Sequence, residues 1–240
     1  MKIPLLPPRI FIPALVVWLF FSSVSTVFDT TEKKETSVMQ EETVKLPTPD
    51  IKGEYSVEET LLERRSVRSY LDEPLELESV SQLLWAAQGI TQELRGLRTA
   101  PSAGATYPLE IYLAAGKVNN LQSGLYRYVP DGHSLVLTKG RDLRRELAEA
   151  ALGQDHVRNA PAIIIIAADY SRTAQRYGER AERYVHMEVG HAGQNICLQA
   201  IGCGLGTVIV GAFYDGRVKE VLGLPENEDP LSLIPVGKPD

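Results

Sequence analysis

Cysteine is scarce in this sequence. Only Cys197 and Cys203 occur among 240 residues, and both lie in one apolar stretch, QNICLQAIGCGLG. A disulfide framework needs more cysteines and a structural zinc site needs more ligands, so the sequence excludes both kinds of small stapled domain. A helix would place the two thiols on roughly opposite sides. We therefore interpret them as small buried side chains.

Positive charge is also in short supply. The 25 lysines and arginines are outnumbered by 31 aspartates and glutamates, which gives a formal net charge of −6. Nucleic-acid phosphates select basic faces, and the aromatic residues here are scattered rather than interleaved with basic ones. The composition therefore argues against nucleic-acid binding. The length and a hydrophobic fraction of 44% suit one ordinary domain plus an appendage.

The common nucleotide-binding and catalytic motifs are missing. The sequence has no Walker motif, and no Ser-His-Asp or Cys-His arrangement can be read from it. The glycines of GCGLGT (202–207) follow an expected helix and precede an expected strand, which reverses the dinucleotide-binding order. Glu188 and His191 have the Glu-x-x-His spacing of di-iron bundles, but the further ligands of such a site are missing. We expect these two residues on a buried helix whose polar groups are satisfied.

Residues 1–28 differ in character from the rest of the chain. Lys2 and Arg9 flank the start of a dozen apolar residues, IFIPALVVWLFF, and serines follow. This run is shorter than the roughly 20 residues that span a bilayer, and the layout is typical of a secretory signal peptide. An uncleaved membrane anchor is the second interpretation. A misassigned start codon is the third, and it would leave the protein cytoplasmic.

Residues 29–55 are polar and charged and have few large apolar side chains. Such a composition predicts a linker. The folded domain is then expected over residues 56–240. Its first helix should begin at Ser56, because Ser56 and Glu59 have the spacing of a capping box, and a second helix should end at Gly89.

Helices and strands alternate along this domain, and no internal repeat is visible. The expected elements are, in order, a strand at 110–115, a hairpin over 124–138, a helix over 141–152, a strand over 160–169, a long helix over 173–202, a strand over 207–213, a helix that Asp215 caps, and a last strand over 231–237. Four successive isoleucines at 163–166 predict a strand buried on both faces. We predict an α+β fold (α/β with a mixed sheet), in which helices flank a mixed central sheet.

Three arginines gather in the octapeptide ERRSVRSY (63–70), although the chain is acidic. Arg64 and Arg68 would stand one turn apart at the end of the first helix. Arg65 and Ser66 lie between them. Guanidinium groups with a hydroxyl suit bidentate capture of a phosphate. Charge alone equally allows a solvated helix end, in which the arginines pair with nearby glutamates.

The segment APSAGATYP (100–108) has almost no side-chain bulk. It fits a flexible surface loop. It fits equally a backbone that is held close to a flat ligand, with amide groups exposed for hydrogen bonding. The segment by itself leaves both interpretations open.

The order of these segments resembles the flavin-dependent nitroreductase family. The matching pieces are Arg-Arg-Ser-x-Arg on the first helix, APSAGATYPLEIYL, LYRY in the hairpin, RYVHMEVGHAGQNICLQAIGCGLGTVIVGAF and the closing LIPVG. The resemblance is strongest to the SagB-type dehydrogenase branch and runs from about Ser56 to Pro239. It implies a nitroreductase-like fold, a homodimer with a long helix at its interface, and FMN bound between the subunits.

The resemblance also assigns residues to the cofactor. The arginine segment would hold the FMN phosphate and the polar edge of the flavin. The loop at 102–104 would approach the isoalloxazine from the partner subunit, and the strand end at 210–211 would point a backbone amide at flavin N5. The implied FMN-binding residues are Arg64, Arg65, Ser66, Arg68, Ser102, Ala103, Gly104, Val210, Gly211 and Lys238.

Two features depart from the family pattern. Many nitroreductases have asparagine and glutamine in the loop where this chain has Ala105 and Tyr107, as the SagB-type branch does. Many relatives also continue into a C-terminal arm with a basic flavin contact. Here Lys238 is the only basic residue left near Asp240.

The implied activity is that of an FMN-dependent oxidoreductase, which passes hydride through flavin N5 between NAD(P)H or an organic substrate and an acceptor. NAD(P)H would bind transiently over the flavin. One version reduces nitroaromatics or quinones, and another is a SagB-type dehydrogenase of a peptide or small-molecule substrate. The alternative is a non-catalytic envelope interaction protein that keeps the fold, which the arginine cluster disfavours. The N-terminal segment predicts a cell-envelope protein, exported or attached to the membrane.

Overall fold

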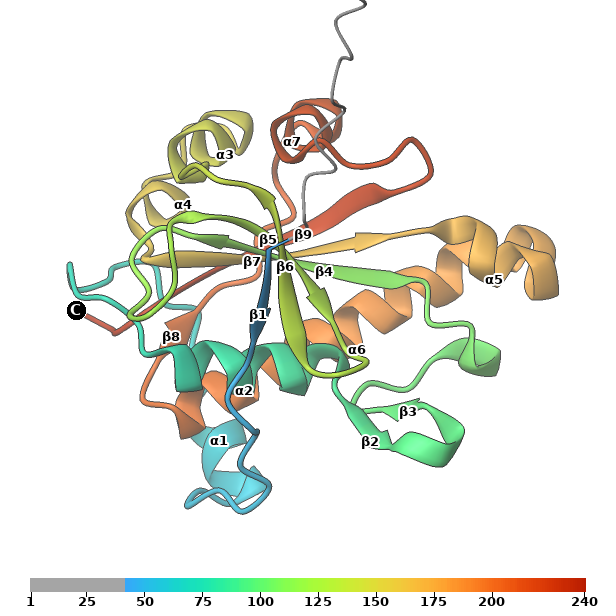
Figure 1. The fold of residues 1–240 in the computed structure, drawn as a ribbon, viewed down its shortest axis with the longest axis horizontal. Coiled ribbons are helices and arrows are strands. Elements are labelled where there is room, and N and C mark those ends of the chain that lie inside the picture. Colours follow the sequence, from blue (N-terminus) through green and yellow to red (C-terminus); the bar gives the residue numbers. More distant parts are fainter. Residues whose placement is uncertain (1–41) are drawn as a thin grey trace, which may run out of the picture. The chain divides into compact units, whose positions relative to one another are not determined.

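A seven-stranded sheet forms the centre of the computed structural model, which describes residues 42–240 (Figure 1). Its strand order is β1-β6-β5-β4-β7-β9-β8. The strands are β1 (Thr43–Lys45), β4 (Leu109–Ala115), β5 (Gly124–Val129), β6 (Ser134–Lys139), β7 (Ala162–Ala168), β8 (Gly206–Thr207) and β9 (Asp229–Gly237), while β2 (Ile90–Gln92) and β3 (Leu97–Arg98) form a separate pair. Neighbouring strands of the large sheet run antiparallel, and parallel pairing in the described residues is confined to single bridges.

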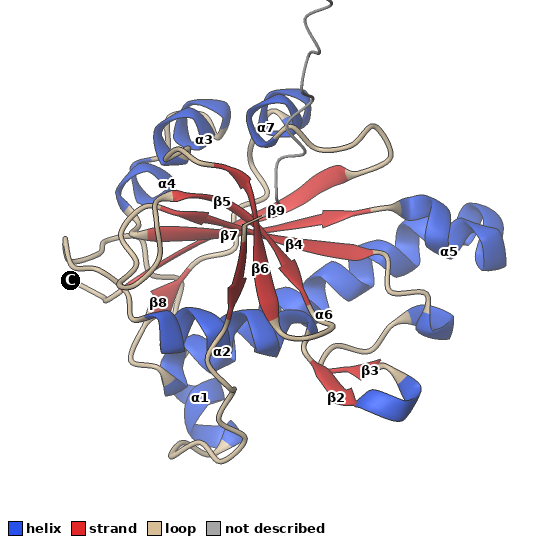
Figure 2. Cartoon of the chain, in the orientation of Figure 1, coloured by secondary structure: helices blue, strands red, loops and turns tan. Residues whose placement is uncertain are grey.

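Helices cover both faces of this sheet (Figure 2). They are α1 (Val57–Glu63), α2 (Leu77–Gln88), α3 (Arg144–Ala150), α4 (Asp155–Asn159), α5 (Tyr170–Tyr177), α6 (Ala181–Gly202) and α7 (Asp215–Leu222). α2 and α6 lie on one face, and α3, α4 and α7 lie on the other. α1 packs on α6, and α5 continues beyond the end of β7. This arrangement confirms the α+β class with a central sheet flanked by helices. The sheet is antiparallel rather than the mixed sheet predicted from the sequence, because each pair of neighbouring strands runs in opposite directions.

β7 is buried on both faces, as its isoleucines predict. Each of its seven residues is at most 1% exposed. Ile164 and Ile166 pack in the core beneath α2 and α6, whereas Ile163 and Ile165 pack in the core beneath α3, α4 and α7. Burying one such side chain contributes about 1.5–3 kcal/mol, so this strand anchors both layers.

Two local signals in the sequence are confirmed. Ser56 Oγ accepts from the Glu59 N–H (3.2 Å), and Glu59 Oε2 accepts from the Ser56 N–H (2.7 Å), which completes the capping box of α1. The expected turn at 130–132 joins β5 to β6, and Gly132 there has a left-handed φ of 77°. Both features depend on hydrogen bonds or dihedrals between near neighbours.

The prediction of one long helix over 173–202 is wrong. The chain instead forms α5, a single 3₁₀ turn at Gly178–Arg180, and then α6. Gly178 ends α5 with φ 54° and ψ −131°, a backbone conformation that is essentially restricted to glycine. The glycine therefore lets the chain change direction between two helices that the apolar pattern had merged.

Two further expectations for the C-terminal half need correction. The strand expected over 207–213 is reduced to β8 and one bridge between Val210 and Leu233, because the chain leaves the sheet at its edge. Asp215 is the first residue of α7 rather than its cap. The capping position is Tyr214, which makes no side-chain capping bond.

The predicted linker over 29–55 is wrong in its C-terminal part. β1 pairs with β6, and Leu46 directly after it is only 3% exposed. A three-residue strand carries too few alternating positions to be recognised from composition. The predicted signal or anchor over 1–28 lies outside the described residues, and no helix between residues 42 and 240 is long and apolar enough to cross a membrane.

His133 fastens the chain after β1 to the rest of the domain. Its Nε2 atom lies 2.7 Å from Ser81 Oγ of α2, and its Nδ1 atom lies 2.8 Å from the Tyr128 hydroxyl. Ser81 Oγ in turn donates to the carbonyl of Pro47 (2.7 Å). Ser81 is 1% exposed, so this Ser-His contact is a buried structural clamp rather than a nucleophile with its base.

Replacing His133 with glutamine tests this clamp. Burial lowers the pKa of His133, so the neutral ring is the form that stabilises the folded chain. This contribution is present above about pH 6.5 and is lost as the pH falls toward the lowered pKa. In urea unfolding, the free energy of unfolding should decrease more between pH 7 and pH 5 in the wild-type protein than in His133→Gln. A His191→Gln control, at an exposed site on α6, should keep the wild-type decrease. Equal decreases in all three proteins would contradict this role.

Candidate functional site

The arginine segment runs along the sheet edge rather than on a helix. α1 ends before Arg64, which has non-helical backbone (φ −55°, ψ 122°). Ser66 forms a parallel bridge with Thr207 of β8, and the Val67 N–H donates to the Thr207 carbonyl (2.9 Å). The prediction that Arg64 and Arg68 stand one helical turn apart is therefore wrong. Four residues of extended chain span about 13 Å, whereas four residues of α-helix rise by about 6 Å.

Arg64 and Arg68 have no carboxylate partner in the described part of the chain. Arg65 instead folds back on α1, where its Nη1 atom donates to the carbonyls of Leu62 and Arg64 (2.8 Å each). The alternative in which the cluster pairs with glutamates of α1 is therefore not formed. Two guanidinium groups of an acidic chain are left available to an anion.

Arg64 and Arg68 influence the pKa of side chains in both helix layers. Burial raises the pKa of the Cys197 thiol on α6, and the Thr207 hydroxyl and Arg64 partly offset that rise. On the other layer, burial and then Arg68 lower the pKa of His156 on α4. Positive charge from this edge segment therefore reaches both faces of the sheet.

The strand end at 210–211 offers one free amide rather than two. The Val210 N–H donates to the Leu233 carbonyl (2.8 Å), and the Leu233 N–H donates back to Val210 (3.0 Å). Gly211 is exposed, its N–H has no partner among residues 42–240, and nothing lies within 4 Å of where a Cβ would stand. Of the two residues assigned by resemblance, Gly211 is the one whose amide can meet a ligand.

The loop at 102–107 is fixed by its own side chains and by α5. Ser102 Oγ accepts from the Tyr107 N–H (2.9 Å), and Arg176 Nη1 donates to the Gly104 carbonyl (3.3 Å). Gly104 has a left-handed φ of 62°, and a Cβ there would lie 2.7 Å from the Tyr177 hydroxyl. These contacts favour a backbone held in place over the flexible-loop interpretation.

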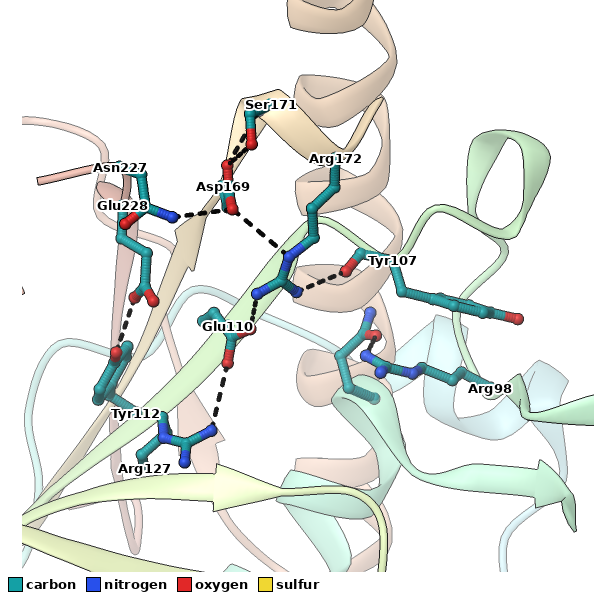
Figure 3. A network of polar contacts seen from close by, with 11 residues as sticks. Arg98, Tyr107, Glu110, Tyr112, Arg127, Asp169, Ser171, Arg172, Asn227 and Glu228 are labelled. Carbon is teal, nitrogen blue, oxygen red and sulfur yellow. Dashed lines mark hydrogen bonds and ion pairs between the residues drawn. The ribbon is translucent and has the colours of Figure 1, made fainter. Parts of the chain in front are cut away.

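Tyr107 is held between two arginines at this end of the sheet (Figure 3). Arg172 Nη1 donates to the Tyr107 carbonyl (3.0 Å), and Arg172 Nη2 donates to Glu110 Oε1 of β4 (2.5 Å). The Arg98 guanidinium lies 4.5 Å from the centre of the Tyr107 ring. Asp169 lies 3.6 Å from Arg172 and caps α5 through the Ser171 N–H (2.9 Å). The loop is therefore anchored to β4, β7 and α5 together.

Sequence reasoning missed the two arginines that hold this loop. Arg98 lies in a two-residue strand and donates to Gln88 at the end of α2 (2.8 Å), so no local pattern identifies it. One signal pointed to the position of Arg172. Asp169 is a helix-capping residue type directly after a buried strand, so it predicts a helix that begins there and contains Arg172.

One chain does not bring the predicted site residues together. The arginine segment lies beside β8, near α1 and the C-terminal end of α6, whereas the loop at 102–104 lies near α5, β2 and β3, toward the N-terminal end of α6 (Figure 1). Gly211 follows β8 and therefore belongs with the arginine segment. The structure thus divides the predicted site into two halves toward opposite ends of α6.

Lys238 is beside the arginine segment but is already paired. Its carbonyl accepts from the Leu71 N–H (3.0 Å), while its ammonium donates to Glu73 Oε2 (2.6 Å). The Glu73 carboxylate raises the pKa of Lys238. A flavin contact from Lys238 would have to replace this exposed ion pair.

A cavity beside α2 and α6 does not coincide with either half. It has a volume of about 600 Å³ and lies between residues 50–57, α2 and α6, and Trp85, Gln199 and Cys203 are among its lining residues. None of the predicted FMN-binding residues lines it. This cavity is therefore separate from the candidate site.

Apolar side chains are exposed on α1, on α6 and after β8. Val57, Leu61 and Leu62 of α1 are 54–72% exposed, and Met187 of α6 and Ile209 are about half exposed. A patch of this kind marks an interaction surface.

The two glycines of α6 differ in their surroundings. Gly190 is exposed, with nothing within 4 Å of where a Cβ would stand. Gly193 is buried, and a Cβ there would lie 3.1 Å from Ile209 Cδ1. Gly193 therefore packs within its own chain, whereas Gly190 leaves room for the close approach of another helix.

Known proteins are similar to this chain in sequence and in fold. The model of the Nitroreductase family matches residues 61–238. A Methanocaldococcus jannaschii protein named "Putative nitroreductase" is 50% identical over 197 residues, which cover 82% of this chain and 98% of that protein.

Two solved structures extend the comparison. A protein from Anabaena variabilis, named "putative nitroreductase", is 32% identical to this chain. The two structures align with a TM-score of 0.74 over 83% of this chain and 42% of that chain. This chain thus spans less than half of the Anabaena chain. The NADPH:FMN oxidoreductase of Vibrio harveyi, in complex with NAD+, is 26% identical with a TM-score of 0.55, over 77% of this chain and 69% of that chain. By sequence and by fold, this chain belongs to the nitroreductase family.

Proposed function

We propose that this protein is an FMN-dependent oxidoreductase, which passes hydride through flavin N5 between NAD(P)H or an organic substrate and an acceptor. The observation that carries the proposal is the pair Arg64 and Arg68, which have no carboxylate partner among residues 42–240 of an acidic chain. Membership of the nitroreductase family and the similarity to an NADPH:FMN oxidoreductase support the choice of cofactor.

The arginine segment suits the phosphate of FMN. A phosphate monoester carries up to two negative charges, and guanidinium groups bind such oxygens through charge-assisted hydrogen bonds. The exposed Ser66 hydroxyl lies between the two free arginines and can donate as well. Arg65 would hold the end of α1 in place rather than contact the phosphate, because its guanidinium already donates to two carbonyls.

The remaining parts of the site suit the flavin ring. Bound FMN supplies the hydride and electron chemistry, and the protein supplies position and charge. The free Gly211 N–H can donate to flavin N5, and the absence of a side chain lets a flat ring approach the backbone. The loop at 102–104 offers a second flat backbone surface, which would exclude water from the other side of the ring.

A homodimer would complete this site. The two halves lie toward opposite ends of α6 in one chain, so the loop at 102–104 would reach the flavin held by the arginine segment of the partner subunit. The exposed apolar side chains of α1 and Met187 of α6 provide a surface for such a contact. A two-fold interface would then form two equivalent sites.

Within this activity, the substrate is either a small acceptor such as a nitroaromatic or quinone, or the substrate of a SagB-type dehydrogenase. Ala105 and Tyr107 favour the second candidate, since they replace the asparagine and glutamine of many nitroreductases. Spectra of the purified protein test the shared part of both versions. It should be yellow and release FMN on denaturation, and a colourless protein that takes up no added FMN would refute the flavin assignment.

Replacing either free arginine should weaken the binding of FMN far more than the binding of riboflavin. Arg64→Ala and Arg68→Ala each remove a charge-assisted contact of about 1.5–3 kcal/mol to the phosphate, which corresponds to a roughly 10- to 150-fold loss of affinity. Fluorescence titration of apoprotein with each ligand measures the difference. Arg145→Ala, at an exposed site paired with Glu149 on α3, is the matched control and should change neither affinity. Equal losses for the two ligands would move Arg64 and Arg68 away from the phosphate.

Gly190→Leu should separate the subunits and release flavin together. Leucine has room at this exposed position within one chain and favours helix more than glycine does, so the monomer fold should persist. Size-exclusion chromatography with multi-angle light scattering and flavin absorbance should be followed in one dilution series.

The control for Gly190→Leu is Gly140→Leu, because Gly140 is also exposed with open space around it, but lies in the loop before α3. This variant should remain dimeric and keep its flavin. A wild-type protein that is monomeric and retains stoichiometric FMN would refute the shared site.

A further inference from the structure

Glu188 of α6 is a buried carboxyl group whose partners are incomplete. It is 2% exposed, and its Oε1 atom has no hydrogen-bond partner among residues 42–240. The expectation that the polar groups of this helix are satisfied is therefore wrong for Glu188. Burying a carboxyl without a full set of partners is costly, and such groups concentrate at functional sites.

α6 packs against residues 103–105 of the loop that would meet the flavin, and the groups that act on Glu188 come from this loop and from β3. Burial raises the pKa of Glu188 to about 7, and the Ser102 hydroxyl, Arg98 and the Ala103 amide oppose the rise. Arg98 of β3 is the charged group acting on Glu188, and it donates to the neutral Gln88 of α2. The carboxyl therefore changes charge near neutral pH, directly beside the loop.

Ser102 connects this carboxyl to the rest of the loop. Its oxygen already accepts from the Tyr107 N–H (2.9 Å), so its hydroxyl hydrogen is the part left to donate to the Glu188 carboxylate. A protonated carboxyl accepts more weakly and also carries a proton to donate, so the same contacts favour the ionised form.

The loop needs such contacts because its backbone is strained. Ala105 and Tyr107 have left-handed φ values of 54° and 45° without being glycines, and Gly104 has 62°. A non-glycine residue in this region is strained and persists only when surrounding contacts hold it. Glu188 acts on the N-terminal part of this loop, while α5 and Arg98 hold its C-terminal part.

We propose that Glu188 is a positioning residue for the flavin: its ionised carboxylate holds Ser102 and Ala103 in the conformation that the loop presents to the flavin of the partner subunit, and its protonation loosens them. This inference rests on the proposed function. It makes cofactor affinity respond to pH through a residue that itself need not touch the cofactor.

Riboflavin titrations over pH 5.5–8.5 test the proposal, because riboflavin lacks the phosphate that would titrate in the same range. In the wild-type protein the Kd should rise as the pH falls through about 7, by up to about tenfold for each pH unit. Glu188→Gln cannot ionise, so it should show the weaker, acid-side affinity at every pH. Glu182→Gln, at an exposed site on the same helix, should keep the wild-type profile. A Glu188→Gln profile that retains the step, or a wild-type profile without one, would overturn the proposal.

Amide hydrogen exchange without flavin separates this inference from the proposed function. In the wild-type apoprotein, peptides covering 102–107 should lose protection between pH 8 and pH 6 after correction for the intrinsic exchange rate, and this result needs no variant to fold. Unchanged protection would overturn the coupling of Glu188 to the loop even if FMN binds. A loop that responds in a protein that binds neither riboflavin nor FMN would refute the proposed function, and with it the flavin role of Glu188, while the proton-linked contact would stand.

Discussion

The burial of β7 on both faces is the constraint on which the other elements depend. Because its side chains alternate between two apolar cores, the sheet must carry helices on each side. α6 covers one face as a single 22-residue helix, about 33 Å long. The loop at 102–107 and the arginine segment lie toward its two ends and are therefore far apart. The end of β7 leads directly into Asp169 and α5, whose side chains hold the loop at 102–107. The core thus places the loop and the arginine segment apart, on one rigid body.

Charge is distributed unevenly over this body. Many arginines have a carboxylate within ion-pair distance, among them Arg127, Arg141, Arg144, Arg145, Arg158 and Arg172. Arg64 and Arg68, on the β8 side, have no such partner in the part of the chain that the structure describes. Near the loop, Glu188 is a carboxyl group with one oxygen that lacks a hydrogen-bond partner among residues 42–240. Burying a carboxyl without a full set of partners is unfavourable, whereas water can solvate the two arginines at the surface. Both departures lie in the segments that the proposed function assigns to the flavin.

The loop itself illustrates how stability and function are joined in this fold. Strained backbone at Ala105 and Tyr107 is tolerated because Arg172 and Arg98 hold Tyr107 from two sides. The same residues connect the loop to Glu110 of β4 and to Gln88 of α2. Under the proposed function, the loop surface that would meet the flavin is therefore ordered in advance, so that ligand binding would need little further ordering.

The sequence by itself determined the features that local interactions decide. The capping box at Ser56 and Glu59, the turn at 130–132 and the buried strand at 163–166 depend on neighbours within a few residues, and the order of motifs identified the family. Only the tertiary structure decided that the arginine segment is not helical, because its edge pairing joins Ser66 to Thr207, 141 positions away. The inward packing of Gly193 and the incomplete partners of Glu188 were settled in the same way. Burial and edge pairing are set by residues distant in the chain, so no local pattern carries them.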